Sequence, residues 1–150
     1  MILHQKVIQN ITGVSILKSI YKNENLPCIN NSKVVDISLY DNGTQLDIKL
    51  IFDVQPKTFP KQWEKYDYSS IGIVLRCINI RYAHVDINKP STEKYNFEIE
   101  IIDGFSRKIN MLSESNSIEV LAESICFDKP FGVLPETTES PRVRIQPTTF

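Results

Sequence analysis

The spacing of hydrophobic residues changes along the chain from a helical period to a strand period. Residues 10–27, NITGVSILKSIYKNENLP, carry apolar side chains at helical spacing, at Val14, Ile16, Leu17, Ile20 and Tyr21. Thr12 is a residue type that accepts hydrogen bonds from the free amides of a first helical turn. The polar run from Asn23 to Pro27 is typical of a helix end. The pattern predicts one N-terminal helix.

Residues 33–54, KVVDISLYDNGTQLDIKLIFDV, alternate between apolar and polar side chains. The apolar positions are Val35, Ile37 and Leu39 before the turn, and Leu46, Ile48, Leu50, Phe52 and Val54 after it. Between them, Asn42-Gly43 supplies the positive φ angles that a two-residue hairpin turn requires. The segment therefore predicts two antiparallel strands that share one buried face.

Further strands are expected after the hairpin. Residues 71–82 are apolar at both parities, which predicts a central strand covered on both sides or a strand with a bulge. Residues 95–101 alternate strictly. Residues 115–127 match helical and strand spacing alike, and their place in a meander favours a strand. Residues 136–150 are rich in proline and threonine.

These patterns predict an α+β fold that is mostly β, with an N-terminal helix followed by an antiparallel sheet of about six or seven strands. We expect residues 1–135 to form a single domain and residues 136–150 to form a flexible or edge-pairing C-terminal tail. A chain of 150 residues can bury roughly 70% of the surface that its unfolded form exposes. The pattern leaves open whether the sheet forms a sandwich or one curved layer.

Composition excludes several classes of protein. The net charge of −1 lacks the basic stripe of a nucleic-acid binder. No apolar run approaches the length of a membrane helix, and the first ten residues do not resemble a signal peptide. Cys28, Cys77 and Cys126 are far apart and odd in number, which is typical of free thiols in a reducing compartment. We expect a cytoplasmic protein that contacts neither nucleic acid nor membrane.

The residues that usually carry chemistry do not converge. The two histidines, His4 and His84, are distant in sequence, and the five glycines form no phosphate-binding loop. Asp47 and Asp53 alternate with apolar residues on their strand, as carboxylates on a solvated face do. The sequence therefore predicts no catalytic residue, no cofactor and no metal, and hence no enzyme.

The single tryptophan, Trp63, stands in the proline-spaced segment FPKQW between two predicted strands. One interpretation is a lid, in which Trp63 and Phe59 cover the end of the sheet. The other is a partner-binding surface. Residues 93–140 carry ten acidic and four basic side chains, which hints at a basic partner. The candidate partner-binding residues are Phe59, Trp63, Tyr66, Tyr68, Glu98 and Glu100.

Residues 12–127 resemble the immunity protein 50 family of bacterial toxin–immunity systems. The similarity runs through the helix and its proline loop (ILKSIYKNENLP), the first hairpin strand (VVDISLYDNG), and the next strand from Ser69 to Ile80. Its sharpest part is residues 46–80, where Phe52, Pro56, Pro60 and Trp63 follow one another between two strands. The chain departs from the family in lacking a glycine after the helix and a tryptophan after the third strand.

The resemblance implies a cytoplasmic protein that binds and neutralises a cognate toxin by steric occlusion, with no chemistry of its own. The main alternative is a ligand- or carbohydrate-binding β-domain that uses the aromatic residues around Trp63. A structural component of a phage or secretion apparatus, and an enzyme, are further alternatives. The oligomeric state is not predicted.

Overall fold

The computed structural model describes residues 11–22, 25–89, 93–103, 106–134 and 143–145. Within these ranges one helix precedes seven strands, with a 3₁₀ turn in each of the first two connections between strands. The elements are α2 (Val14–Tyr21), β1 (Ser32–Tyr40), η1 (Asp41–Gly43), β2 (Gln45–Ile51), η2 (Lys61–Trp63), β3 (Ser70–Asp86), β4 (Lys94–Ile102), β5 (Ser106–Leu112), β6 (Ser117–Val133) and β7 (Val143–Ile145). The predicted α+β class, mostly β, is confirmed.

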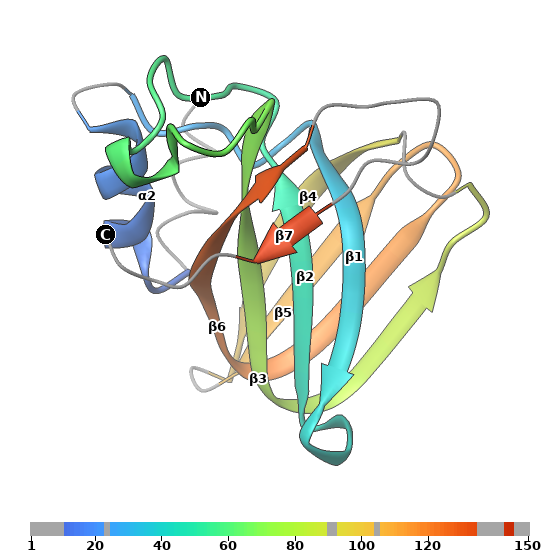
Figure 1. Cartoon of the computed structure of the whole chain (residues 1–150). Coiled ribbons are helices and arrows are strands. Elements are labelled where there is room, and N and C mark those ends of the chain that lie inside the picture. The colour runs from blue at the N-terminus through green and yellow to red at the C-terminus, as the bar shows by residue number, and fades with distance from the viewer. Residues whose placement is uncertain (1–10, 23–24, 90–92, 104–105, 135–142, 146–150) are drawn as a thin grey trace.

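The strands form one antiparallel sheet that closes on itself. Their order is β3-β2-β1-β4-β5-β6-β7, and an additional pairing of β3 with β6 joins the two ends of the row of six. β3 and β6 are 17 residues long and bend sharply, so each belongs to both halves of the sheet (Figure 1). Irregularities in their pairing between Ile73 and Leu75, and between Ile80 and Tyr82, allow this bend. The weakest seam is β1–β4, at Ser32–Tyr95 and Lys33–Lys94.

The main hydrophobic core fills the inside of the closed sheet. Every strand from β1 to β6 contributes, and so do the start of the described chain and α2. The fully buried members include Leu17, Leu46, Ile48, Leu50, Leu75, Cys77, Ile109, Met111, Val120 and Ala122. The apolar residues at both parities of β3 have a direct explanation. Ile73 and Leu75 face the core, whereas Val74 packs on the outer face against Phe131 and Val133.

The predicted hairpin is confirmed, but its two-residue turn and one face of β1 are corrected. The last strand pair is Tyr40–Gln45, so the loop spans four residues, 41–44, and contains η1. Asn42 and Gly43 have φ angles of 57° and 87°, and the Thr44 amide donates to the Asp41 carbonyl at 3.2 Å. In β1 the register shifts between Val34 and Asp36. This bulge puts Val35 into the outer cluster, so the predicted common face of Val35, Ile37 and Leu39 is wrong. Leu39 and Val54, also predicted to be buried, are 62% and 57% exposed.

The helix is shorter than its sequence pattern and does not use the predicted cap. Gly13, with φ of 83°, precedes α2 without a side-chain cap. Thr12 instead forms a parallel bridge: its amide donates to Ile125 and its carbonyl accepts from Phe127, at 3.1 and 2.9 Å. Backbone pairing with β6 thus occupies Thr12, the residue that local propensity predicts to cap the helix.

The ambiguous segment 115–127 is a strand, because it supplies most of β6. Of the proposed tail, residues 136–142 and 146–150 lie outside the described residues. Val143–Ile145 pair with Phe131–Val133 of β6. The first ten residues also lie outside the described part of the chain.

Gly72 marks a place where the backbone of β3 meets the Phe131 ring. A Cβ atom on Gly72 would lie 2.2 Å from the tip of that ring and 2.5 Å from the Leu50 carbonyl oxygen. We predict that Gly72→Ala lowers the free energy of unfolding by about 1–3 kcal/mol, because a well-packed contact must open. Urea unfolding followed by circular dichroism measures this loss.

Gly43→Ala is the control for Gly72→Ala. Gly43 has no atom within 4 Å of an added Cβ, but its φ is +87°. Gly43→Ala should therefore lower the free energy of unfolding by about 1 kcal/mol, through backbone strain alone. A smaller loss for Gly72→Ala than for Gly43→Ala would contradict the packing described for β3.

Candidate functional site

Trp63 lies in an aromatic lid at one end of the closed sheet. It is 2% exposed and packs in a cluster with Ile20 and Tyr21 of α2, and with Tyr68 and Ile71. The Trp63 and Tyr68 rings meet edge to face with centroids 5.5 Å apart. Figure 1 shows η2 beside α2 at this end of the molecule. The geometry is that of the lid interpretation.

Hydrogen bonds hold the lid segment in place. The Trp63 amide donates to the Pro60 carbonyl at 2.9 Å, which forms the turn of η2. The Gln55 side chain accepts from the Ile71 amide at 2.7 Å and donates to the Ile71 carbonyl at 3.1 Å. The Tyr21 hydroxyl donates to the Val54 carbonyl at 2.6 Å. The β2–β3 connection is therefore fastened to both the helix and the sheet.

The structure does not bring the six candidate partner-binding residues together. Trp63 and Tyr68 are buried, whereas Phe59 and Tyr66 are partly buried at the edge of the same cluster. Glu98 and Glu100 are exposed on β4. Along the row of strands, β2 and β1 lie between β4 and β3. Their role in partner binding stays a prediction. Because the Trp63 ring is covered, it offers no open platform on which a sugar could stack.

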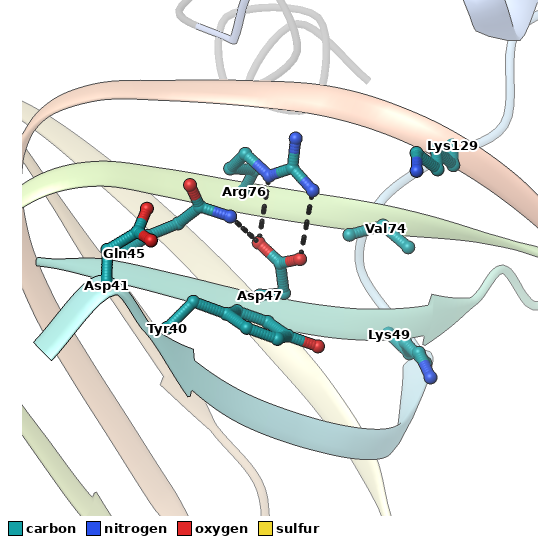
Figure 2. A pocket seen from close by; sticks show the side chains of 8 residues that line it. All are labelled: Tyr40, Asp41, Gln45, Asp47, Lys49, Val74, Arg76 and Lys129. Carbon is teal, nitrogen blue, oxygen red and sulfur yellow. Dashed lines mark hydrogen bonds and ion pairs between the residues drawn. The ribbon is translucent and has the colours of Figure 1, made fainter. Parts of the chain in front are cut away.

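A charged hollow of about 310 Å³ lies on the outer face of the sheet. Figure 2 shows the side chains that surround it. β2 and β3 provide its floor, and the end of β1 and a residue of β6 form its rim. Its lining residues are Tyr40, Asp41, Gln45, Asp47, Lys49, Val74, Arg76 and Lys129.

Arg76 is the centre of this hollow. Its Nε and Nη2 donate to the two oxygens of Asp47 at 3.0 and 3.1 Å, and Gln45 Nε2 donates to Asp47 Oδ1 at 3.3 Å. Arg76 Nη2 also lies 3.0 Å from Asp128 Oδ2, an ion pair without hydrogen-bond geometry. The hydrogen bond to Asp47 raises the pKa of Arg76 against the opposing effect of desolvation. The guanidinium is thus a fixed positive charge between two carboxylates.

The pairing of β2 with β3 creates this network. Asp47 stands directly opposite Arg76, on the face away from Leu46 and Ile48. The expectation that Asp47 and Asp53 share a solvated face is wrong for Asp47, which is only 8% exposed. The register between distant strands decides this, and local alternation does not encode it. The sequence signal that could have indicated this network is Arg76, a charged residue between the apolar residues Leu75 and Cys77.

Other reactive groups are either buried or scattered. Burial raises the pKa of the Cys77 thiol to about 12, so it stays protonated and unreactive in the folded protein. His84 is exposed on β3. In the described ranges no three His, Cys, Asp or Glu residues are grouped so that they could hold a metal ion. No helix in those same ranges is long and apolar enough to cross a membrane.

The lid makes a direct prediction for Trp63→Ala. Removing a buried indole leaves a cavity, so we expect the free energy of unfolding to fall by about 3–5 kcal/mol. Denaturant unfolding followed by circular dichroism provides the measurement. Tyr66→Ala, in the partly exposed part of the lid, is the comparison and should cost about 1 kcal/mol. A red-shifted emission of Trp63 in the native protein, as exposed indole gives, would contradict the lid.

The partly buried network around Arg76 makes a second prediction. Arg76→Met leaves Asp47 without its counter-ion, and we expect a loss of about 2–3 kcal/mol in unfolding free energy because the pair is only partly solvated. Lys94→Met is the matched control, since Lys94 and Asp53 form an ion pair of 2.9 Å with side chains 51% and 45% exposed. It should change stability by less than about 0.5 kcal/mol. Equal losses in the two variants would rule out a special role for burial.

One comparison with known proteins identifies a family. The family model described as immunity protein 50 matches residues 13–130. No curated protein matches the sequence. A solved structure, an uncharacterized protein from Neisseria gonorrhoeae, has a TM-score of 0.44 and 18% identity over 66% of this chain and 91% of that one. The chain therefore belongs to the immunity protein 50 family, whose members are generally non-catalytic and whose membership implies neutralisation of a cognate toxin.

Proposed function

We propose that this protein neutralises its toxin by binding it and physically covering the surface that the toxin needs for activity. The observation that carries the proposal is the extent of the family match. Residues 13–130 run from Gly13, directly before α2, to Pro130, three residues before the end of β6. The family likeness thus involves all six strands of the closed sheet and not an isolated motif.

The fold suits inhibition by a preformed surface. Specific protein interfaces bury about 1,600 Å² in total, and they bind more tightly when little ordering is needed. In the hollow, strand pairing fixes the backbone and the bonds to Asp47 fix the Arg76 side chain. These charged side chains need no rearrangement before a partner binds. They therefore favour tight binding and fix the orientation of the partner.

We place part of the toxin contact at the hollow. Its rim presents Tyr40, which is 44% exposed, together with Asp41 and Lys129. Tyrosine is enriched among the residues that carry most of an interface's binding energy. Lys49 reaches Asp36 at 3.5 Å on the neighbouring strand, so the surface offers both signs of charge. A toxin segment that carries both a basic and an acidic side chain matches it.

The six residues predicted from the sequence enter this proposal in two ways. Glu98 and Glu100 are exposed and would attract a basic toxin surface. Phe59 and Tyr66 could contact a partner at the edge of the lid, whereas the buried Trp63 and Tyr68 would act by supporting that edge from beneath. A cytoplasmic location is part of the same proposal, since an immunity protein protects the cell that makes the toxin.

The test uses the toxin domain that the proposed function predicts to be encoded immediately upstream of the gene for this protein. We expect co-expression to restore growth, and purified protein to abolish toxin activity at one copy per toxin. The mass of the toxin should be unchanged after incubation, because occlusion neither forms nor cleaves a covalent bond in the toxin. Continued killing despite soluble expression would refute the function. Inhibition at far below one copy per toxin, or a changed toxin mass, would refute the occlusion mechanism while leaving neutralisation intact.

A pair of neighbouring residues tests the contact surface. Tyr40→Ala should weaken toxin binding by about tenfold or more. Leu39→Ala, which removes a more exposed side chain from the opposite face of the same strand, should leave affinity unchanged. Equal affinities for both variants and the parent protein would place the toxin elsewhere. Calorimetric titration of the toxin gives these affinities.

A further inference from the structure

The C-terminal half of β3 has an open edge. β2 pairs with β3 only from Gly72 to Ile78, and the last backbone bond on that side runs from the Ile80 amide to the Thr44 carbonyl at 3.0 Å. Beyond it, Tyr82 to Asp86 pair with β6 on one side. In the described chain no strand pairs with their other side. Figure 1 shows this half of β3 as the outer margin of the molecule, in yellow-green.

This edge is regular, unlike the free edges of β1 and β4. From Tyr82–Leu121 to Asp86–Ser117 the pairing with β6 proceeds without a register shift. The free edge of β1 contains the bulge next to Val34. The edge of β4 is partly covered by Asn30, whose Oδ1 accepts from the Phe97 amide at 2.7 Å. Bulges and covering groups are the usual protection of an edge against another strand, and the β3 edge lacks them from Tyr82 to Asp86.

Two rows of inward-facing hydrophobic side chains, each crossing several strands, end at this edge. Met111 and Ile118 are 0% and 1% exposed, and Val85, next in the same row across the strands, is 43% exposed. In the neighbouring row, Ala83 is exposed beside the buried Val120. Side chains directly opposite each other lie on one face of a sheet. One more strand would therefore continue both rows and cover their exposed ends.

We propose that the missing strand is β3 of a second copy of this chain, paired antiparallel about a two-fold axis at Val85. Such an axis is perpendicular to the sheet. Odd-numbered residues of one copy therefore lie opposite odd-numbered residues of the other, and even-numbered opposite even-numbered, so side chains opposite each other share a face. With Val85 opposite Val85, His84 lies opposite Asp86 on the outer face, and Ala83 lies opposite Ile87 on the inner face. A hydrogen-bonding His–Asp pair and an apolar pair thus occur twice. The edge is complementary to itself.

The proposed dimer joins two sheet halves, β4-β5-β6-β3, into one continuous sheet. The contact involves a single strand from each copy, so it falls among small interfaces of less than about 1,200 Å². We therefore expect a reversible dimer with a dissociation constant on the order of micromolar. None of the residues that line the hollow belongs to this edge, so the inference does not depend on the proposed toxin contact.

Two lysine variants test the dimer. Sedimentation velocity from low micromolar to near-millimolar concentration should show a monomer–dimer equilibrium for the parent protein. Val85→Lys brings two like charges together at the axis and should give a monomer with unchanged thermal stability. Val54→Lys is the matched control, since Val54 is a similarly exposed valine far from this edge, and should dimerise as the parent does. A parent protein that stays monomeric, or a dimer that survives Val85→Lys, would overturn the proposal.

A cysteine variant tests the register. Directly opposite residues of antiparallel strands have Cα atoms about 4.5–5.5 Å apart, which a disulfide can bridge. Val85→Cys should form a disulfide-linked dimer on mild oxidation, seen on a non-reducing gel. The parent chain with its three free cysteines and Val54→Cys should not. Linkage of Val54→Cys at the same rate, or none for Val85→Cys, would exclude pairing at Val85.

Discussion

The pairing of β3 with β6 organises both faces of this protein. These strands contact each other along almost their whole length, from Ser70–Val133 to Asp86–Ser117. Because both bend, the inner faces of the two sheet halves are brought together and bury one core. Without this ladder the remaining strands would form an open row whose apolar face met water. Such a row would lose the burial that drives folding.

The same ladder positions the outer-face charges. Arg76 on β3 lies between Asp47 of β2 and Asp128 of β6, at 3.0 Å from each carboxylate. A displacement of either neighbouring strand would separate one of these ion pairs. Core and hollow are therefore coupled through the backbone of β3. This arrangement gives an immunity protein a charged surface that exists before its toxin arrives, and the lid around Trp63 closes the end of the core beneath α2.

The sequence predicted those features that depend on neighbouring residues. Asn42-Gly43 identified the hairpin, the alternation of Leu46, Ile48 and Leu50 identified a buried face, and the proline-spaced tryptophan pointed to the family. The bulge at Val35 was missed because apolar residues continued at the expected spacing through it. Thr12 was misassigned because pairing with β6 competes with helix capping there.

Long-range register could not be read from the pattern. Nothing within β2 indicates that Asp47 faces an arginine 29 positions later, and nothing within β3 or β6 indicates that they close the sheet. Each strand shows which of its faces is apolar, but the partner of each residue is set by the bends and bulges of the assembled sheet. The candidate hollow depends on that partnering, so it emerged only in three dimensions.

Amide hydrogen exchange of the free and toxin-bound protein tests most directly whether the proposed binding surface is preformed. The account predicts that amides of the β3–β6 ladder and of β2 beneath the hollow are already protected to the level of global unfolding in the free protein. Toxin binding should then add protection only at the contact. Rapid exchange along the ladder in the free protein, with protection gained only in the complex, would show that the surface forms on binding and would contradict the account.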